Sequence, residues 1–179
     1  MKYCGHCGSV TNRRIPDGDH LPRLVCDACD TVHYENPTLV VGCVPEYEGR
    51  ILICRRAIEP RRGFWTLPAG FIEFGETLEA GAARECREEA LAQVEIDGLL
   101  AVVSIPEIHQ VLVFFRANLA EPAFGAGLES LDARLVSAEE IPWDEMAFSS
   151  SRFVLERYLA DRAAGRREVH ITTLAVGWG

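Results

Sequence analysis

The sequence predicts an α+β protein, with a mixed β-sheet packed against helices and a small cysteine-rich unit in front of it. Two C-x2-C pairs stand within the first 30 residues. Short apolar segments typical of strands follow residue 36. One helix-forming segment lies between these strands, and a second lies after them. A long helix between strands and another near the end are typical of a mixed sheet covered by helices.

Length, composition and charge narrow the class of protein. A chain of 179 residues suits one domain with a small appendage, and 48% hydrophobic residues can build a core. The formal net charge of −9 argues against a general nucleic-acid or membrane-surface binder. No apolar run reaches the roughly 18 residues of a membrane span, and no signal-peptide segment begins the chain. We therefore expect a cytoplasmic protein.

The first predicted unit, residues 1–35, contains four cysteines in two pairs, Cys4 with Cys7 and Cys26 with Cys29. Each pair can hold a metal from a tight turn, and four thiolates complete the tetrahedral shell of structural zinc. Rubredoxin-like iron and two disulfides are the alternatives. The unit is too small to fold on its core alone, so Zn²⁺ should supply most of its folding energy.

The other three cysteines lie in apolar contexts, at positions 43, 54 and 86. We expect them to be buried, inert thiols, which fits a reducing compartment.

The second predicted unit, residues 36–172, begins at Asn36-Pro37, and residues 173–179 form a tail. Strands are expected at 38–44, 50–55, 98–105 and 111–117, just before residue 70, and near 134–136. A turn at Glu48-Gly49 joins the first two strands. A last helix should run from about 151 to 163, with Ser150 or Ser151 as its N-cap and Gly165 as its stop.

The helix from Leu78 to about Ala90 carries the main functional signal. Thr77 is a good N-cap, and Leu91 should extend the helix toward Gln93. Three glutamates stand at i, i+3 and i+4 on one face of this helix: Glu85, Glu88 and Glu89. Their carboxylates suit Mg²⁺ or Mn²⁺, and Arg84 can brace one of them. A glutamate-rich face is usually only solvated, but the glycine-containing turn in front of this helix favours a phosphate-metal site.

The segment GFIEFGETLEAGAARECREEALA, residues 70–92, resembles the Nudix box, with Leu91 where the family usually has glycine. The resemblance implies the Nudix fold, a curved mixed sheet between helices, here preceded by a zinc ribbon. It implies metal-assisted hydrolysis of a nucleoside diphosphate derivative, with Mg²⁺ or Mn²⁺ on Glu85, Glu88, Glu89 and Gly70. It also implies a further glutamate beyond the box. Glu129 is the first candidate and Glu107 the second, and the catalytic base is left open between Glu85 and a loop glutamate.

Four arginines shortly before the box could grip the phosphates: Arg55, Arg56, Arg61 and Arg62. The alternative for each is an ordinary solvated arginine. We expect Trp65 to be a core residue.

A four-cysteine ribbon ahead of a Nudix domain looks like the NADH pyrophosphatases, but the Ser-Gln-Pro-Trp-Pro-Phe-Pro stretch of those enzymes is absent. The chain is more similar to plant-type FAD pyrophosphatases, which also accept ADP-ribose, in segments such as Ile15–Asp19, Gly63–Gly70 and Ala147–Ser150. The resemblance implies products FMN and AMP, or AMP and ribose 5-phosphate, and a homodimer. The alternatives are an NADH or other dinucleotide pyrophosphatase, a nucleoside triphosphate or capped-RNA hydrolase, and a non-catalytic nucleotide sensor or nucleic-acid-binding module.

Overall fold

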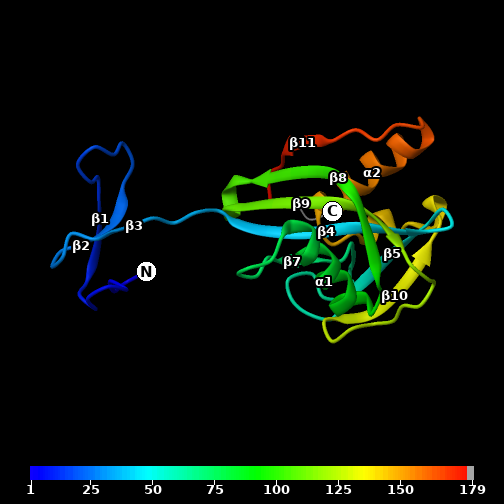
Figure 1. The fold of residues 1–179 in the computed structure, drawn as a ribbon, viewed down its shortest axis with the longest axis horizontal. Helices are drawn as coiled ribbons and strands as arrows, with labels where there is room; N and C mark the ends of the chain where they lie inside the picture. Colours follow the sequence, from blue (N-terminus) through cyan, green and yellow to red (C-terminus); the bar gives the residue numbers. More distant parts are fainter. Residues whose placement is uncertain (177–179) are drawn as a thin grey trace. The chain divides into compact units, whose positions relative to one another are not determined.

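The structure is a computed structural model that describes residues 1–176. The chain divides into two compact units, Met1–Asn36 and Pro37–Gly179 (Figure 1). Of the predicted tail at 173–179, residues 177–179 lie outside the described part. Within residues 1–176, no helix has the length and apolar character needed to cross a membrane.

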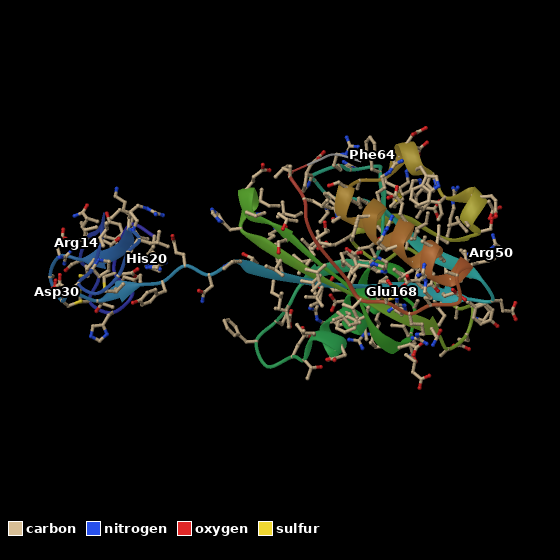
Figure 2. The ribbon with its side chains drawn as sticks, turned by 90° about the horizontal axis from the view of Figure 1, so that it is seen from above. Arg14, His20, Asp30, Arg50, Phe64 and Glu168 are labelled. Carbon is tan, nitrogen blue, oxygen red and sulfur yellow. The ribbon has the colours of Figure 1, made fainter. Side chains whose placement is uncertain are left out.

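The N-terminal unit is a three-stranded antiparallel sheet in the order β1-β2-β3. Its strands, which the sequence analysis did not predict, are β1 (Thr11–Arg14), β2 (Arg23–Cys26) and β3 (Val32–His33). Few residues are buried in it: Cys4, Thr11, Leu24, Val25 and Cys26. Surface contacts such as the Arg14–Asp30 ion pair at 2.7 Å (Figure 2) contribute little to stability in water. The small core agrees with a unit that depends on a metal for its fold.

The second unit is built on a mixed sheet in the order β10-β5-β4-β9-β8-β11, with β6 paired to β5 and β7 paired to β4. The pairs β4–β9 and β8–β11 are parallel, and the others are antiparallel. The strands are β4 (Thr38–Tyr47), β5 (Arg50–Arg56), β6 (Trp65–Thr66), β7 (Ala69–Phe71), β8 (Val94–Ile105), β9 (Gln110–Leu119), β10 (Ser130–Val136) and β11 (His170–Thr173). Short 3-10 turns are η1 (Pro106–Ile108), η2 (Ala138–Glu140) and η3 (Trp143–Glu145).

Apolar side chains of the central strands point to both faces of this sheet, and both faces are buried. On β4, Val40 and Val44 belong to one apolar cluster, while Val41 and Cys43 belong to the other. The first cluster includes Val154 and Leu155 of helix α2 (Ser149–Ala163), and the second includes Ala82, Cys86 and Ala90 of helix α1 (Leu78–Ala90). The sheet therefore lies between the two helices (Figure 1), which confirms the predicted fold class.

Helix α1 begins as predicted and ends differently. The hydroxyl of Thr77 accepts a hydrogen bond from the Ala80 N–H at 3.2 Å, which caps the first turn. Leu91, expected to extend the helix, instead has φ +50° and ψ +29°, a left-handed cap. The expectation was wrong because the loop between β9 and β10 binds the helix end: the Gly125 N–H donates to the Ala90 carbonyl at 2.8 Å. Tertiary contacts thus impose a turn that Leu disfavours.

Helix α2 begins two residues earlier than predicted, at Ser149, and its N-cap is Phe148, without a side-chain hydrogen bond. Ser150 and Ser151, the expected caps, are buried inside the first turn. The Ser151 hydroxyl lies 3.1 Å from that of Thr66. The capping prediction was wrong because this hydroxyl has a partner on β6 instead of the helix end. Gly165 follows the helix with φ +63°, as expected for a stop.

Strand β11 was missed, because its four residues carry no distinct pattern. It is held in place by Asp161 of α2, whose carboxylate accepts hydrogen bonds from Arg116 at 2.5 Å and from the Glu168 N–H at 3.0 Å. His170, the first residue of β11, lies 3.2 Å from the same carboxylate. Arg116 and Asp161 are both buried, so a paired network joins β9, α2 and β11.

Candidate functional site

The predicted carboxylates stand where α1 packs against β7. Glu85 and Glu89 are buried, whereas Glu88 is exposed. The carboxylate of Glu89 accepts a hydrogen bond from the Ala69 N–H at 3.3 Å. A Cβ atom at Gly70 would lie 2.4 Å from the carboxyl carbon and both oxygens of Glu85, so glycine leaves the space in which this carboxylate lies. The strand backbone and the Glu85 carboxylate are therefore in direct contact.

The two buried carboxyl groups are held where ionisation is unfavourable. Burial raises the pKa of Glu89 to about 8, and the charge of Glu85 adds to this effect. Burial also raises the pKa of Glu85, although its contact with Arg84 acts in the opposite direction. Two carboxylates that repel each other in a desolvated place provide the charge and the oxygen ligands that a divalent cation neutralises.

Arg84 forms hydrogen bonds with three carboxylates and one backbone carbonyl on this side of the site. Its guanidinium donates to Glu76 at 2.7 Å, to Glu85 at 2.7 Å, to Glu88 at 3.0 Å and to the Phe71 carbonyl at 2.9 Å. The hydrogen bond from Arg84 is the main reason that the pKa of Glu76 is lowered. The predicted brace on one carboxylate is thus a brace on three, and it also fixes the loop in front of the helix.

The loop from Ala120 to Glu129 brings Glu129 to the same place. The Gly127 N–H donates to the Glu89 carbonyl at 3.0 Å, and the Glu129 carbonyl accepts from the Ala57 N–H at 2.8 Å. The Glu129 side chain is exposed, and its charge reaches both Glu85 and Glu89. Glu107 lies elsewhere: its carboxylate accepts a hydrogen bond from the Val176 N–H at 2.6 Å.

The four predicted arginines lie at the end of β5 and in the loop after it. The charge of Arg56 acts on Glu89, and its guanidinium stacks 5.0 Å from the centre of the Phe148 ring. Arg55 donates to the Gly63 carbonyl at 2.7 Å. Arg61 stacks 3.6 Å from the Phe64 ring, a residue labelled in Figure 2, and Arg62 is exposed. Trp65 is buried in the core, as predicted.

In residues 1–176, a single group of three or more Cys, His, Asp or Glu residues has its ligand atoms all within 4.8 Å of one another: Cys4, Cys7, Cys26 and Cys29. The carboxylates of α1 are spread more widely around Arg84. Such a partial set suits magnesium, which keeps waters and substrate phosphates among its ligands and seldom sits in an all-protein cage.

The four thiols fit a zinc ion. The Sγ atoms are 3.4 Å apart for Cys7 and Cys26 and 3.8 Å apart for Cys4 and Cys29. A tetrahedron with Zn–S bonds of about 2.3 Å has edges of roughly 3.8 Å. None of the seven cysteines forms a disulfide, and those at 43, 54 and 86 are buried as predicted. A hydrogen bond from the Ser9 backbone is the main reason that the pKa of Cys7 falls to about 6.

The sequence analysis gives no role to His33 or to Gly127. In the first unit, the Nε2 atom of His33 lies 3.2 Å from Cys4 Sγ. In the second unit, the Gly127 N–H donates to the Glu89 carbonyl at the end of α1. No spacing signals the His33 contact, but the run Phe124-Gly-Ala-Gly127 directly before Leu128-Glu129 is a signal that could have been used.

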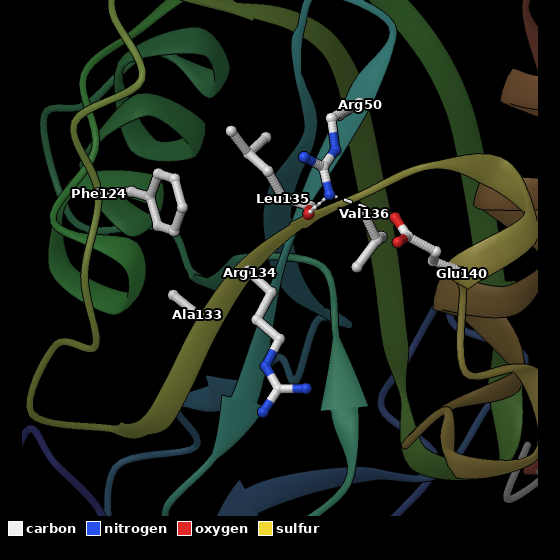
Figure 3. A pocket seen from close by; sticks show the side chains of 7 residues that line it. All are labelled: Arg50, Phe124, Ala133, Arg134, Leu135, Val136 and Glu140. Atoms are coloured by element: carbon white, nitrogen blue, oxygen red, sulfur yellow. Dashed lines mark hydrogen bonds and ion pairs between the residues drawn. The ribbon is translucent and has the colours of Figure 1, made fainter.

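A cavity of about 550 Å³ opens beside the edge strand β10 (Figure 3), and it is not this site. Arg50 points into it and donates to the Leu135 carbonyl at 2.7 Å. None of the predicted functional residues lines it; the lining residues are Arg50, Phe124, Ala133, Arg134, Leu135, Val136 and Glu140.

Two relatives of known name match most of this chain. An NAD-capped RNA hydrolase NudC of Stutzerimonas stutzeri is 29% identical over 170 residues, 93% of this chain and 59% of its own length. An ADP-ribose pyrophosphatase of Methanocaldococcus jannaschii is 28% identical over 125 residues, 68% of this chain and 73% of its own. The chain thus spans about three fifths of the length of that NudC relative.

A solved NUDIX hydrolase of Nitrosomonas europaea is 50% identical, covers 98% of this chain and 99% of its own, and superposes with a TM-score of 0.95. The NUDIX domain of Shewanella oneidensis NrtR, solved with ADP ribose, is 19% identical with a TM-score of 0.60 and shares the fold. Residues 2–35 match the Nudix N-terminal zinc-ribbon family, and residues 36–157 match the NUDIX domain family. With its glutamate-bearing helix between the strands of a mixed sheet, this chain belongs to the NUDIX family.

Proposed function

We propose that this protein hydrolyses the diphosphate bond of a nucleoside diphosphate derivative, with ADP-ribose and FAD as its substrates and Mg²⁺ or Mn²⁺ as its cation. The observation that carries the proposal is the pair Glu85 and Glu89, both buried and facing the backbone at Ala69 and Gly70. Burying two acidic groups side by side costs free energy that a bound cation offsets. The named ADP-ribose pyrophosphatase among the relatives supports the substrate class.

The residues have separable roles in this reaction. Glu85, Glu88 and Glu89, with the Gly70 carbonyl, would hold the cation, and Arg84 orients Glu85 and Glu88 through its hydrogen bonds. The bound cation would supply charge neutralisation of the phosphates and a lower pKa for an attacking water. Arg56, followed by Arg55, Arg61 and Arg62, binds the remaining phosphate charge.

Glu129 would accept the proton of the attacking water, with Glu85 as the alternative base. Water attacks one phosphorus and the bridging P–O bond breaks, so that two monophosphates leave and the proton passes to the carboxylate. FAD would give FMN and AMP; ADP-ribose would give AMP and ribose 5-phosphate. Comparing Glu129→Gln with Glu85→Gln assigns the base: loss of the pH dependence of kcat identifies it.

The test is incubation with Mg²⁺ and a panel of FAD, ADP-ribose, NADH, diadenosine polyphosphates and dNTPs, followed by chromatography of the products. Glu89→Gln should reduce turnover by at least about a hundredfold, because a metal ligand is lost. Glu79→Gln is the matched control, an exposed glutamate on the first turn of the same helix. Rapid cleavage of dNTPs with FAD and ADP-ribose left intact would refute the proposed substrates.

A second candidate is hydrolysis of NAD-capped RNA or NADH. It is favoured by the match to the NudC relative, which extends over 93% of this chain and so includes the ribbon. The net charge of −9 argues against tight RNA binding. A short RNA with a 5′ NAD group, compared with ADP-ribose at equal concentration, decides between them by kcat/KM.

The four-cysteine unit is proposed to hold one structural Zn²⁺. We further propose that the protein is a cytoplasmic homodimer, which sedimentation equilibrium of the full chain tests: a monomer at micromolar concentration contradicts the dimer.

A further inference from the structure

The tightest backbone contact of the site involves Gly127. A Cβ atom at this position would lie 1.7 Å from the Glu88 carbonyl oxygen and 2.8 Å from its carbon. Real Cβ atoms do not approach backbone so closely. The φ angle of Gly127 lies outside the left-handed region, so this angle does not itself call for glycine. The requirement for glycine comes from the space that the Glu88 carbonyl occupies.

This contact fixes the loop on the last turn of the metal-site helix. The Gly127 N–H donates to the Glu89 carbonyl at 3.0 Å, and the Gly125 N–H donates to the Ala90 carbonyl at 2.8 Å. These carbonyls belong to the last turn, where a helix leaves its acceptors without internal partners. The loop thus provides hydrogen-bond donors for the carbonyls of Glu89 and Ala90, the last two residues of α1.

The same loop segment is fixed again immediately afterwards. The Ser130 N–H donates to the Gly127 carbonyl at 3.1 Å, and the Ala57 N–H donates to the Glu129 carbonyl at 2.8 Å. Glu129 therefore lies two residues after Gly127, which is bonded to α1, and its own carbonyl is bonded to Ala57. Its backbone position is determined although its side chain is exposed. The direction of its Cα–Cβ bond is thereby set, so the carboxylate is confined to the few staggered rotamers available from that position.

We infer that Gly127 is a positioning residue: by allowing the loop to lie on the Glu88 carbonyl, it places the Glu129 carboxylate opposite Glu85 and Glu89. The inference rests on the proposed function, in which Glu129 acts on the substrate side of the site. A bulkier residue would lift the loop away from α1 and move Glu129 with it. Displacement of a reacting group by about 1 Å can cost a hundredfold in rate.

The test is Gly127→Ala in the full-length protein with ADP-ribose and Mg²⁺. We expect kcat to fall about ten- to a hundredfold, while KM changes less than about threefold, because the cation and phosphate ligands stay on α1 and β5. Gly125→Ala is the matched control in the same loop. Its Cβ would meet Leu91 Cδ1 at 3.5 Å, an ordinary contact, so kcat should stay within about twofold.

A double-mutant cycle separates positioning from general damage to the fold. In the Glu129→Gln background, Gly127→Ala should cause no further loss of kcat, because the group that it positions is already inactive. An equal loss in that background would overturn the inference, and so would full kcat in the Gly127→Ala protein or an equal loss in Gly125→Ala.

Amide hydrogen exchange gives a readout without substrate. The Ala57 N–H, bonded to the Glu129 carbonyl, should exchange at least about tenfold faster in Gly127→Ala and unchanged in Gly125→Ala. Unchanged protection in Gly127→Ala would overturn the inference. Because this measurement does not depend on catalysis, it distinguishes failure of the inference from failure of the proposed function, which is shown by a wild-type protein inactive on the whole panel.

Discussion

At the scale of single residues, Glu89 makes the metal-free protein sensitive to pH. Its pKa is about 8 in the folded protein, mainly because of burial, against about 4.3 in an unfolded chain. The folded state therefore holds a proton that the unfolded state has lost between these two values. Stability from this group is fully present below pH 4.3 and is lost as pH rises through 8.

We predict that the free energy of unfolding in magnesium-free buffer falls between pH 5.5 and 8.5, by at most about 1.4 kcal/mol per pH unit from this group. Urea titration at four pH values measures it. Glu89→Gln, which is neutral throughout, should flatten the slope. Added Mg²⁺ should oppose the loss at high pH, because the cation binds the ionised form. A slope equal in wild type and Glu89→Gln would contradict the assignment.

Leu91 is the second residue with a measurable cost. Its left-handed backbone conformation costs a residue with a side chain about 1–2 kcal/mol. Glycine avoids this cost, but it loses roughly 0.5–1 kcal/mol more backbone entropy on folding. Leu91→Gly should therefore raise the free energy of unfolding by about 0.5–1 kcal/mol, because the side chain is largely exposed and has little packing to lose.

Thermal unfolding followed by circular dichroism checks this, with an expected rise in Tm of about 1–4 °C. Leu91→Ala is the control, since it keeps the unfavourable backbone conformation and removes the same side chain. A glycine variant no more stable than the alanine variant would show that the left-handed turn costs nothing here.

At the scale of elements, the loop before α1 and the helix itself are joined by Arg84. Its side chain is 12% exposed, and it pairs with Glu76, Glu85 and Glu88. Arg84→Ala leaves three acidic groups without their cation, and removing one partner of a buried network costs about 3–5 kcal/mol. We expect a loss near the lower end of this range in magnesium-free buffer, because Glu88 is exposed to water.

The matched control is Arg87→Ala, which removes an exposed arginine from the same helix and should change stability by less than about 0.5 kcal/mol. Denaturant unfolding of both variants, with and without Mg²⁺, is the measurement. Equal effects of the two substitutions would mean that Arg84 is a solvated surface residue.

Elements with a local signal were predictable. Helix α1 follows from its helix formers and from Thr77, and the hairpin of β4 and β5 follows from Glu48-Gly49 between apolar runs. Elements decided by distant partners were not. Strand β11 depends on Asp161 and Arg116, and the first turn of α2 on a hydroxyl pair across to β6. Local propensity contains no information about such contacts.

The residues of the site also fall into those that a local pattern predicts and those that depend on distant partners. Glu85, Glu88 and Glu89 share one helical face, so their spacing predicts their proximity. Gly70 and Gly127 are different, because the space that a side chain would take at each is filled by a group elsewhere in the chain: the Glu85 carboxylate and the Glu88 carbonyl. Arg84 was expected to reach one carboxylate and reaches three, since Glu76 approaches it from the loop in front of the helix.

At the scale of the whole molecule, the chain divides into two compact units that differ in how much apolar surface they bury. Residues 1–36 bury few apolar side chains, and four Sγ atoms lie within 4.8 Å of one another. Structural zinc contributes about 10–16 kcal/mol in small domains, more than such a core can supply. The unit from Pro37 onward has its own two apolar clusters and all of the proposed catalytic residues.

We therefore predict that Cys26→Ser abolishes zinc binding and unfolds residues 1–36, while hydrolysis in Mg²⁺ falls less than about threefold. Zinc content by atomic absorption, limited proteolysis and amide exchange report on the two units separately. Cys86→Ala is the control: it removes a buried thiol from the second unit and should leave the zinc content unchanged. A Cys26→Ser protein with bound zinc and a protected first unit would contradict the four-thiolate site. Loss of hydrolysis parallel to loss of zinc would instead show that the ribbon takes part in catalysis.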